Sequence, residues 1–222
     1  TATGTAPTVA QANVLDAVTA GVLTATVQDD ATALATLTGT GNAYTITLDN
    51  DDAATIAELV TINAATTGAI TLNALTIPAN YEDTAANLVL AFAGITTHTG
   101  TLTVSGAAAT VAQANILDAV TTGVITEVLA ADTATNLATL TGTNNAYTIT
   151  INNDETATIA QLKAINAATT GAITLNTSTI AANYTDTVAN LTSAFAGITT
   201  HTGTLTATGT APTVAQANVL DA

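Results

Sequence analysis

The feature that most constrains this chain is an internal repeat. Residues 1–17, TATGTAPTVAQANVLDA, recur unchanged as residues 206–222. A further copy lies between them, since VAQANVLDAV at 9–18 matches VAQANILDAV at 111–120. INAATTGAITLN (62–73 and 165–176) and AFAGITTHTGTLT (91–103 and 194–206) repeat at nearly the same interval. Self-similarity at a fixed period is typical of repeat proteins, in which each unit packs mainly against its neighbours.

This spacing predicts the domain organisation. Residues 1–8 are expected to end a preceding repeat, and residues 9–110 to form repeat 1. Residues 111–213 form repeat 2, and residues 214–222 begin repeat 3. Because the array is interrupted within a repeat, we expect the parent protein to be longer.

Each repeat divides further into four helix–strand units of roughly 26 residues, a length expected for stacked repeats. In the segment 159–174, Ile159, Leu162 and Ile165 recur at helical spacing and are followed by Thr-Thr-Gly. We expect Gly171 to end this helix in the left-handed conformation. Residues 147–151 alternate between Tyr or Ile and Thr, which predicts a strand with one apolar face.

We therefore predict an α/β fold. Its finer form is a right-handed α/β solenoid of helix–strand units, with a parallel sheet on one side and short helices on the other. Six glycines are expected between a helix and a strand, with those strands neighbours in one sheet: Gly21, Gly68, Gly100, Gly123, Gly171 and Gly203. Seven apolar residues are expected in the core: Val14, Leu34, Ile46, Ile70, Leu88, Ile149 and Ile173. The alternative is a string of tandem β-sandwich domains of about 100 residues each.

The charge balance excludes several classes of function. The chain carries 16 acidic residues and one basic residue, Lys163, for a net charge of −15. A nucleic-acid binder needs clustered Lys and Arg, so we expect no nucleic-acid partner. No apolar run is long enough to span a bilayer, so we expect no membrane insertion. There is no cysteine, which excludes disulfides and thiolate metal sites.

The repeated motifs VAQANxLDAVTTGVIT, NLATLTGTxNAYTIT and INAATTGAITL resemble repeat regions of very large secreted bacterial surface proteins. Such proteins occur in cyanobacteria and other Gram-negative bacteria, often beside haemolysin-type (RTX) calcium-binding segments. The resemblance covers essentially the whole chain. It implies export, an extracellular or cell-surface location, calcium outside the cell, and a role in surface layers, fibrils or adhesion. The glycine-aspartate nonapeptide of true RTX calcium coils is absent.

Two acidic turns are the candidate metal site, with calcium as the candidate cofactor. Each turn follows a predicted strand, and the candidate ligands are Asp49, Asp51, Asp52, Asp154 and Glu155. Calcium prefers several carboxylate and carbonyl oxygens, which such a turn can supply. The competing interpretation is that these Asn and Asp residues form turns and cap the next helix.

No catalytic constellation is visible, so we predict that the chain is not an enzyme. His98 and His201 are equivalent in the two repeats and lie in ITTHTG, away from a second His or a paired carboxylate in the sequence. We expect these imidazoles to bind backbone carbonyls or a neighbouring coil. Threonines should project from the outer sheet face: Thr45, Thr47, Thr71, Thr101, Thr103, Thr148, Thr150, Thr174, Thr204 and Thr206. Such rows suit lateral packing, and an ice-binding array is the less favoured interpretation.

The sequence favours a structural tandem-repeat segment of an extracellular surface layer, filament or fibre. Its expected partners are further copies of the same repeat, bound head-to-tail by coil stacking and side by side by lateral packing. The alternative function is an adhesin stalk or binding module for calcium, glycan or ice. Electron microscopy of the parent protein separates a lattice or filament from isolated projecting rods.

Overall fold

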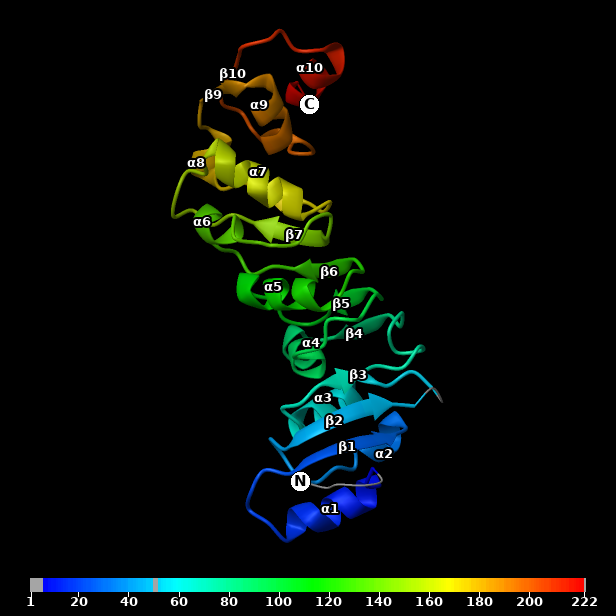
Figure 1. The fold of residues 1–222 in the computed structure, drawn as a ribbon. Helices are drawn as coiled ribbons and strands as arrows, with labels where there is room; N and C mark the ends of the chain where they lie inside the picture. Colours follow the sequence, from blue (N-terminus) through cyan, green and yellow to red (C-terminus); the bar gives the residue numbers. More distant parts are fainter. Residues whose placement is uncertain (1–5, 50–51, 222) are drawn as a thin grey trace. The chain divides into compact units, whose positions relative to one another are not determined.

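The computed structural model describes residues 6–49 and 52–221. Among these residues it has a mixed α/β fold with ten helices and ten strands (Figure 1). The chain divides into two compact units, residues 1–107 with 116–124, and residues 108–115 with 125–222. Helix α5 (Val111–Val120) contributes to both units.

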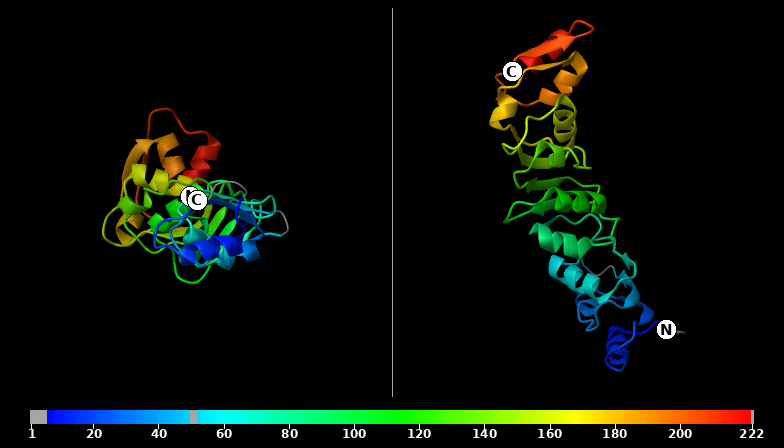
Figure 2. Two further views of the ribbon diagram at one scale, coloured as in Figure 1. Left: turned by 60° about the horizontal axis from the view of Figure 1, so that its bottom comes forward. Right: turned by 90° about the vertical axis from the view of Figure 1, so that its left-hand side faces the viewer.

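Unit 1 contains four further helices and five strands. In chain order these are α1 (Val9–Ala17), β1 (Thr24–Asp29), α2 (Ala31–Leu34), β2 (Ala43–Leu48), α3 (Ile56–Ala65), β3 (Ile70–Thr71), β4 (Tyr81–Asp83), α4 (Ala85–Phe92) and β5 (Leu102–Val104). Strands β1, β2 and β3 pair in that order, and β4 pairs with β5. Both sets of pairs are parallel. Figure 2 shows the ribbon from two further directions. Helices α3 and α4 pack against each other.

Unit 2 repeats this arrangement. It contains β6 (Ile125–Val128), α6 (Ala134–Leu137), β7 (Ala146–Thr150), α7 (Ile159–Ala168), β8 (Ile173–Thr174), α8 (Thr177–Ile180), β9 (Tyr184–Thr187), α9 (Val188–Phe195), β10 (Leu205–Thr208) and α10 (Val214–Leu220). Strand β7 pairs with β6 and with β8, and β9 pairs with β10, all in parallel. The β-sandwich alternative requires antiparallel pairs, so the parallel pairing favours the α/β prediction.

Most of the helices begin at a capping threonine, while Asp30 caps α2 and Asn176 caps α8. In α3 and α7 the N-cap Thr accepts a hydrogen bond from the third helical residue, whose own Glu or Gln side chain returns to the cap backbone. This capping box satisfies backbone N–H groups that have no partner within the helix. Leu162 and Ile165 are buried along α7, as the helical spacing predicted, and Ala168 continues the stripe, whereas Ile159 is only half-buried.

The strand phase was predicted correctly. Tyr147 and Ile149 are fully buried, while Thr148 between them is exposed. Thr45, Thr71 and Thr174 are likewise exposed, and Thr47 and Thr150 are half-buried. The threonine-rich face of these strands is therefore the outer face.

Most of the predicted core is confirmed. Leu34, Ile46, Leu88 and Ile149 are fully buried. Val14 was wrongly predicted, because it is 65% exposed. Its helix buries Val9 and Ala12, which are three residues apart, and this spacing places Val14 on another side of the helix. Ile70 and Ile173 are only half-buried, at the first residue of two-residue strands.

The six glycines do lie between a helix and a strand, but two details of the prediction were wrong. Strand β2 lies between β1 and β3, which follow Gly21 and Gly68, and β7 lies between β6 and β8, which follow Gly123 and Gly171, so these strands are not direct neighbours. Gly171 also does not adopt the left-handed conformation. Glycine is needed at this position because the backbone lies close to β7, and a Cβ atom at residue 171 would lie 2.3 Å from the Tyr147 carbonyl oxygen.

Each repeat contains five strands, whereas four helix–strand units were predicted. The additional strands are β4 in YEDT and β9 in YTDT, each followed immediately by a helix. Their short length and acidic residues give a weak strand pattern in the sequence. Helices α2 and α6, of four residues each, are likewise too short for a periodic signal.

Candidate functional site

The acidic turns are organised by an asparagine side chain. In unit 1 the Asn73 side-chain amide donates to the backbone carbonyls of Asp49 at 2.5 Å and Asp52 at 2.8 Å. In unit 2 Asn176 donates in the same way to the carbonyls of Asn152 and Glu155. These carbonyl oxygens are therefore already engaged in closing the turn.

The carboxylates of these turns also have protein partners. Asp49 Oδ1 accepts a hydrogen bond from Gln28 Nε2 at 2.7 Å. Glu155 accepts two from Thr135, from its backbone N–H at 2.6 Å and from its hydroxyl at 3.0 Å. Asp52 and Asp154 are exposed. The arrangement supports the turn-forming interpretation for Asp49 and Glu155.

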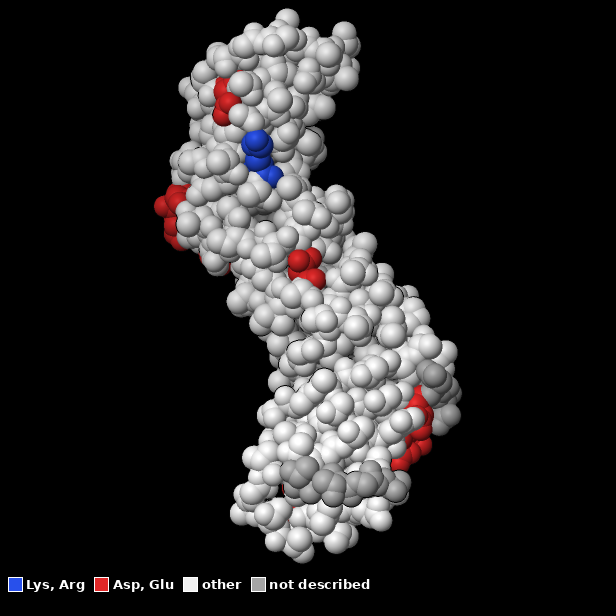
Figure 3. All heavy atoms as spheres, in the orientation of Figure 1, with Lys and Arg blue, Asp and Glu red and all other residues white. Residues whose placement is uncertain are grey.

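The calcium role of Asp49, Asp51, Asp52, Asp154 and Glu155 stays a prediction. Asp51 lies outside the described residues. Within residues 6–49 and 52–221, no three His, Asp or Glu side chains come together in a way that could hold a metal ion. On the face drawn in Figure 3, acidic side chains form small separate groups on a largely uncharged surface.

The two histidines bind backbone carbonyls of a neighbouring segment, as predicted. His98 Nε2 lies 2.9 Å from the Ala79 oxygen, and His201 Nε2 lies 2.9 Å from the Ala182 oxygen. A carbonyl only accepts, so Nε2 carries the proton. His98 is fully buried, and this burial lowers its pKa, which keeps the ring neutral near pH 7. Its Nδ1 lies 3.1 Å from the Thr121 hydroxyl.

Each histidine belongs to an aromatic cluster. The ring centroids of Phe92 and His98 are 4.7 Å apart, and Tyr81 lies 5.6 Å from both. Tyr184, Phe195 and His201 form the same cluster in unit 2. The Tyr81 and Tyr184 hydroxyls donate to the carbonyls of Ala54 and Ala157. The geometry is that of a packed, hydrogen-bonded core.

The sequence reasoning missed a set of buried polar residues, which we call the Thr–Asn ladder. Its members occupy equivalent places in the two units: Asn42 and Asn145, Thr66 and Thr169, and Thr76 and Thr179. Thr66 and Thr169 each donate to a tyrosine carbonyl of the adjacent strand at 2.7 Å and accept from a glycine N–H. Thr76 and Thr179 accept from the backbone N–H of Ala54 and Ala157. The sequence signal that could have indicated the ladder was the recurrence of NAYT and TTG in both repeats.

A helix-start motif, Asp-Thr-x-x-Asn, was also missed. It occurs at Asp83–Asn87, Asp132–Asn136 and Asp186–Asn190. In each case the threonine caps the helix, while the aspartate accepts from the threonine N–H and the asparagine side chain. The pKa of Asp186 is lowered, first by the bond from Asn190. These acidic residues therefore have a structural role at the helix starts, beside the capping threonines.

One buried carboxyl does not belong to any such motif. Glu127 on β6 is 3% exposed, and neither of its oxygens has a hydrogen-bond partner among the described residues. Burial raises its pKa to about 7. It stands opposite Tyr147 of β7, and the equivalent pair in unit 1 is Ala25 opposite Tyr44. The acidic residue is thus a feature of one repeat only.

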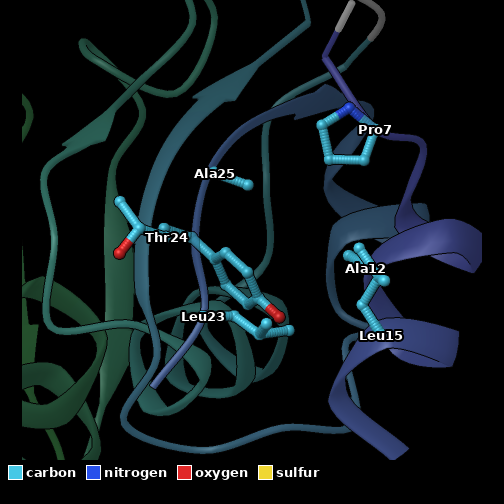
Figure 4. Close-up of a pocket in the computed structure, with 7 residues that line it drawn as sticks. Pro7, Ala12, Leu15, Leu23, Thr24 and Ala25 are labelled. Atoms are coloured by element: carbon cyan, nitrogen blue, oxygen red, sulfur yellow. The ribbon is translucent and has the colours of Figure 1, made fainter. Parts of the chain in front are cut away.

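Unit 1 has a small cavity where Ala25 stands (Figure 4). It measures about 180 Å³ and is lined by Pro7, Ala12, Leu15, Leu23, Thr24, Ala25 and Tyr44. The Tyr44 hydroxyl is buried and has no hydrogen-bond partner among the described residues, and burial raises its pKa. The lining contains no carboxylate, imidazole or basic group, so it offers no general acid–base pair near neutral pH.

No protein-family model, no curated protein and no solved structure matches this chain. Among the described residues, no helix is both long enough and apolar enough to cross a bilayer.

Proposed function

We propose that this chain is a structural tandem-repeat segment of an extracellular surface layer, filament or fibre. Its units stack as a right-handed α/β solenoid, because parallel strands joined by crossover helices take that hand. One observation carries the proposal: both units contain the same parallel strand pairs, the same Thr–Asn ladder and the same histidine cluster. Repetition of whole hydrogen-bonded coils is the property needed for open-ended stacking.

The hydrogen-bond contacts of the polar side chains support a structural role. Asn73, the two histidines, the threonines of the Thr–Asn ladder and the cap threonines bind backbone groups of adjacent segments or cap helices. A catalytic site instead concentrates strained or perturbed groups in one cleft. The proposal therefore includes no catalytic residues.

Lateral packing through the outer sheet face is the second part of the proposal. In unit 1 Thr26 stands opposite Thr45, and Thr47 opposite Thr71. In unit 2 the row is interrupted, since Val128 stands opposite Thr148. Val128 is 56% exposed. An irregular face with exposed apolar residues suits contact with another protein surface better than contact with an ordered ice lattice.

Covalent arrays of the 111–213 repeat test the proposal. We would join two, four and eight repeats and measure the maximum dimension by small-angle X-ray scattering. Five strand spacings of ~4.8 Å predict an increment on the order of 25 Å for every added repeat. A dimension that grows with roughly the square root of repeat number would indicate flexibly linked beads and would overturn the stacking proposal.

A further inference from the structure

Lys163 is the only lysine or arginine of the chain, and its side chain contacts an asparagine on another helix. Lys163 lies on α7, and its Nζ donates a hydrogen bond to Asn190 Oδ1 on α9 at 2.5 Å. Both side chains are half-buried, and α7 packs against α9. The contact therefore joins two helices of unit 2 through residues that are 27 positions apart in the sequence.

A carboxylate holds the other end of the same amide. Asn190 Nδ2 donates to Asp186 Oδ1 at 2.7 Å, and the Thr187 backbone N–H donates to the same oxygen at 2.7 Å. The bond from Asn190, the bond from Thr187 and, more weakly, the positive charge of Lys163 lower the pKa of Asp186. This carboxyl is therefore charged at neutral pH and can accept a proton. The Asn190 amide thus lies between an amine and a carboxylate.

The hydrogen bond from Lys163 brings its nitrogen close to the amide carbon of Asn190. Because a C=O bond is ~1.23 Å long, an oxygen 2.5 Å from Nζ places Cγ at about 3–3.7 Å from that nitrogen. Reacting atoms in a near-attack arrangement are about 3–3.5 Å apart. A lysine amine is a nucleophile, and a carboxylate can transfer protons in the reaction. The three side chains therefore supply a nucleophile, an acyl carbon and a proton acceptor.

Repeat 1 has the same amide and carboxylate but no lysine. Asn87 Nδ2 donates to Asp83 Oδ1 at 2.8 Å, as Asn190 does to Asp186. Position 60, the counterpart of 163, is valine. The pairing of aspartate with asparagine therefore belongs to the helix start in both repeats, and only repeat 2 adds a nucleophile to it.

We propose that Lys163 and Asn190 form an intramolecular isopeptide bond, with Asp186 as the proton-transfer group. The bond between Lys163 Nζ and Asn190 Cγ forms, the bond between Asn190 Cγ and Nδ2 breaks, and Nδ2 leaves as ammonia. The product is a secondary amide that joins α7 to α9 covalently. The reaction needs no oxidant, reductant or further reactant.

The protons of this reaction balance among the three side chains and water. Lys163 first loses one proton to solvent, which its half-buried position allows, and the neutral amine attacks Asn190 Cγ. In the tetrahedral adduct both nitrogens are bonded to the same carbon, so the carboxylate beside Nδ2 is also within reach of Nζ. Asp186 takes a proton from Nζ and gives it to Nδ2, after which ammonia leaves and the carbonyl re-forms.

The cross-link closes residues 163–190 into one covalent loop, whether or not the repeats stack. Closing a loop reduces the conformational freedom of the unfolded chain, as a disulfide does. The inference is therefore independent of the proposed stacking function, and its failure would leave that function untouched.

Intact-mass spectrometry of the denatured 222-residue chain tests the proposal. After incubation of the folded chain at alkaline pH, its mass should be lower than the mass calculated from the sequence by one ammonia molecule. Lys163→Arg keeps the positive charge but removes the amine, and Asn190→Ala removes the acyl carbon. Asp186→Asn removes the proton acceptor. All three variants should keep their calculated masses, and circular dichroism would show that they fold like the parent.

Trypsin gives an independent readout, because Lys163 is the only residue after which it can cleave this chain. The denatured parent should resist trypsin, since an acylated lysine is no longer a substrate. Denatured Asn190→Ala, in which the lysine stays free, should be cut once after Lys163.

Val60→Lys is the matched gain of function. It places an amine on α3, at the position equivalent to Lys163, in the repeat that already pairs Asp83 with Asn87. This variant should lose two ammonia molecules, one in each repeat. A Val60→Lys chain that loses no second ammonia would contradict the assignment of the reaction to these three groups.

Two results would overturn the cross-link itself. One is a parent chain that keeps its calculated mass and is cut by trypsin. The other is a loss of ammonia that persists in Lys163→Arg, because that loss would come from succinimide formation at an asparagine and not from the lysine.

Discussion

The two repeats share a polar framework, but among the described residues only the second buries an acid. The capping boxes of α3 and α7, the Thr–Asn ladder and the glycine–carbonyl contacts are the same in both. Opposite the equivalent residues Tyr44 and Tyr147, however, one repeat has Ala25 and the other has the buried carboxyl of Glu127. This comparison indicates that the shared hydrogen bonds determine the backbone arrangement of each repeat. The arrangement is the same whether Ala25 or Glu127 stands opposite the tyrosine.

The largest expected effects come from core residues that both repeats share. Leu59 and Leu162 are 0% and 1% exposed in equivalent helices. Leu59→Ala and Leu162→Ala should each lower the free energy of unfolding by ~2–5 kcal/mol, as measured by chemical denaturation. Leu90→Ala, at a residue that is 55% exposed, is the control and should cost much less. If the two substitutions lowered the free energy of unfolding by clearly different amounts, the two repeats would not be energetically equivalent.

Glu127→Ala, which introduces the residue of repeat 1, should stabilise the chain at alkaline pH. The carboxyl holds its proton more tightly in the folded state, where its pKa is about 7, than at its ordinary pKa of 4.5. Ionisation therefore leaves stability unchanged below pH 4.5 and lowers it progressively up to about pH 7. Above that pH the full penalty is about 3 kcal/mol.

The titratable groups on the elements around Glu127 are Tyr147 on β7, Asp118 on α5 and Asp132 before α6. The raised pKa comes from burial alone. Glu127→Gln, which keeps the shape and cannot ionise, should remove the pH dependence that this residue contributes. Equal stability differences between parent and Glu127→Gln at pH 4 and pH 8.5 would show that Glu127 is not a buried acid.

The Thr–Asn ladder should contribute less per residue. Thr76 and Thr179 are fully buried and accept a backbone N–H hydrogen bond, so valine at either position leaves that N–H without a partner. Thr76→Val and Thr179→Val should each cost ~1–3 kcal/mol in denaturation experiments. Serine keeps the hydroxyl and should retain more stability than valine. A valine variant as stable as the parent would show that the ladder is not needed.

The smallest effect is expected at the helix caps. Thr84 and Thr187 cap α4 and α9 by accepting the N–H of Asn87 and Asn190. Thr84→Ala and Thr187→Ala should each cost ~1 kcal/mol, and serine should restore most of it. If alanine and serine variants melt at the same temperature, the caps do not stabilise these helices.

The sequence predicted much of the fold because its strongest signals are local. Alternation at residues 147–151 gave the correct strand faces, and Thr-Thr-Gly gave the correct helix ends. Strands β4 and β9 could not be predicted, since their short acidic segments are extended only by pairing with β5 and β10. The sequence also could not show why residue 171 must be glycine, because the reason is contact with the carbonyl oxygen of Tyr147, which lies 24 residues earlier.

The candidate site was harder to predict than the fold. Asp49 and Glu155 look like metal ligands in sequence, but their hydrogen-bond partners, Gln28 and Thr135, are about 20 residues away. Sequence position alone cannot reveal that contact. The burial of Glu127 was hidden for a similar reason, because Thr126 and Val128 on either side of it are exposed and only the strand phase places it inside.

The central claim is that each repeat is stabilised by its neighbours, and unfolding of covalent arrays tests it most directly. Arrays of one, two, four and eight copies of residues 111–213 would be unfolded in guanidinium chloride and followed by circular dichroism. Nearest-neighbour stacking predicts that the unfolding midpoint rises steeply over the first few copies and then levels off. A midpoint that is the same for one and eight copies would show that the repeats fold independently, and would contradict the account.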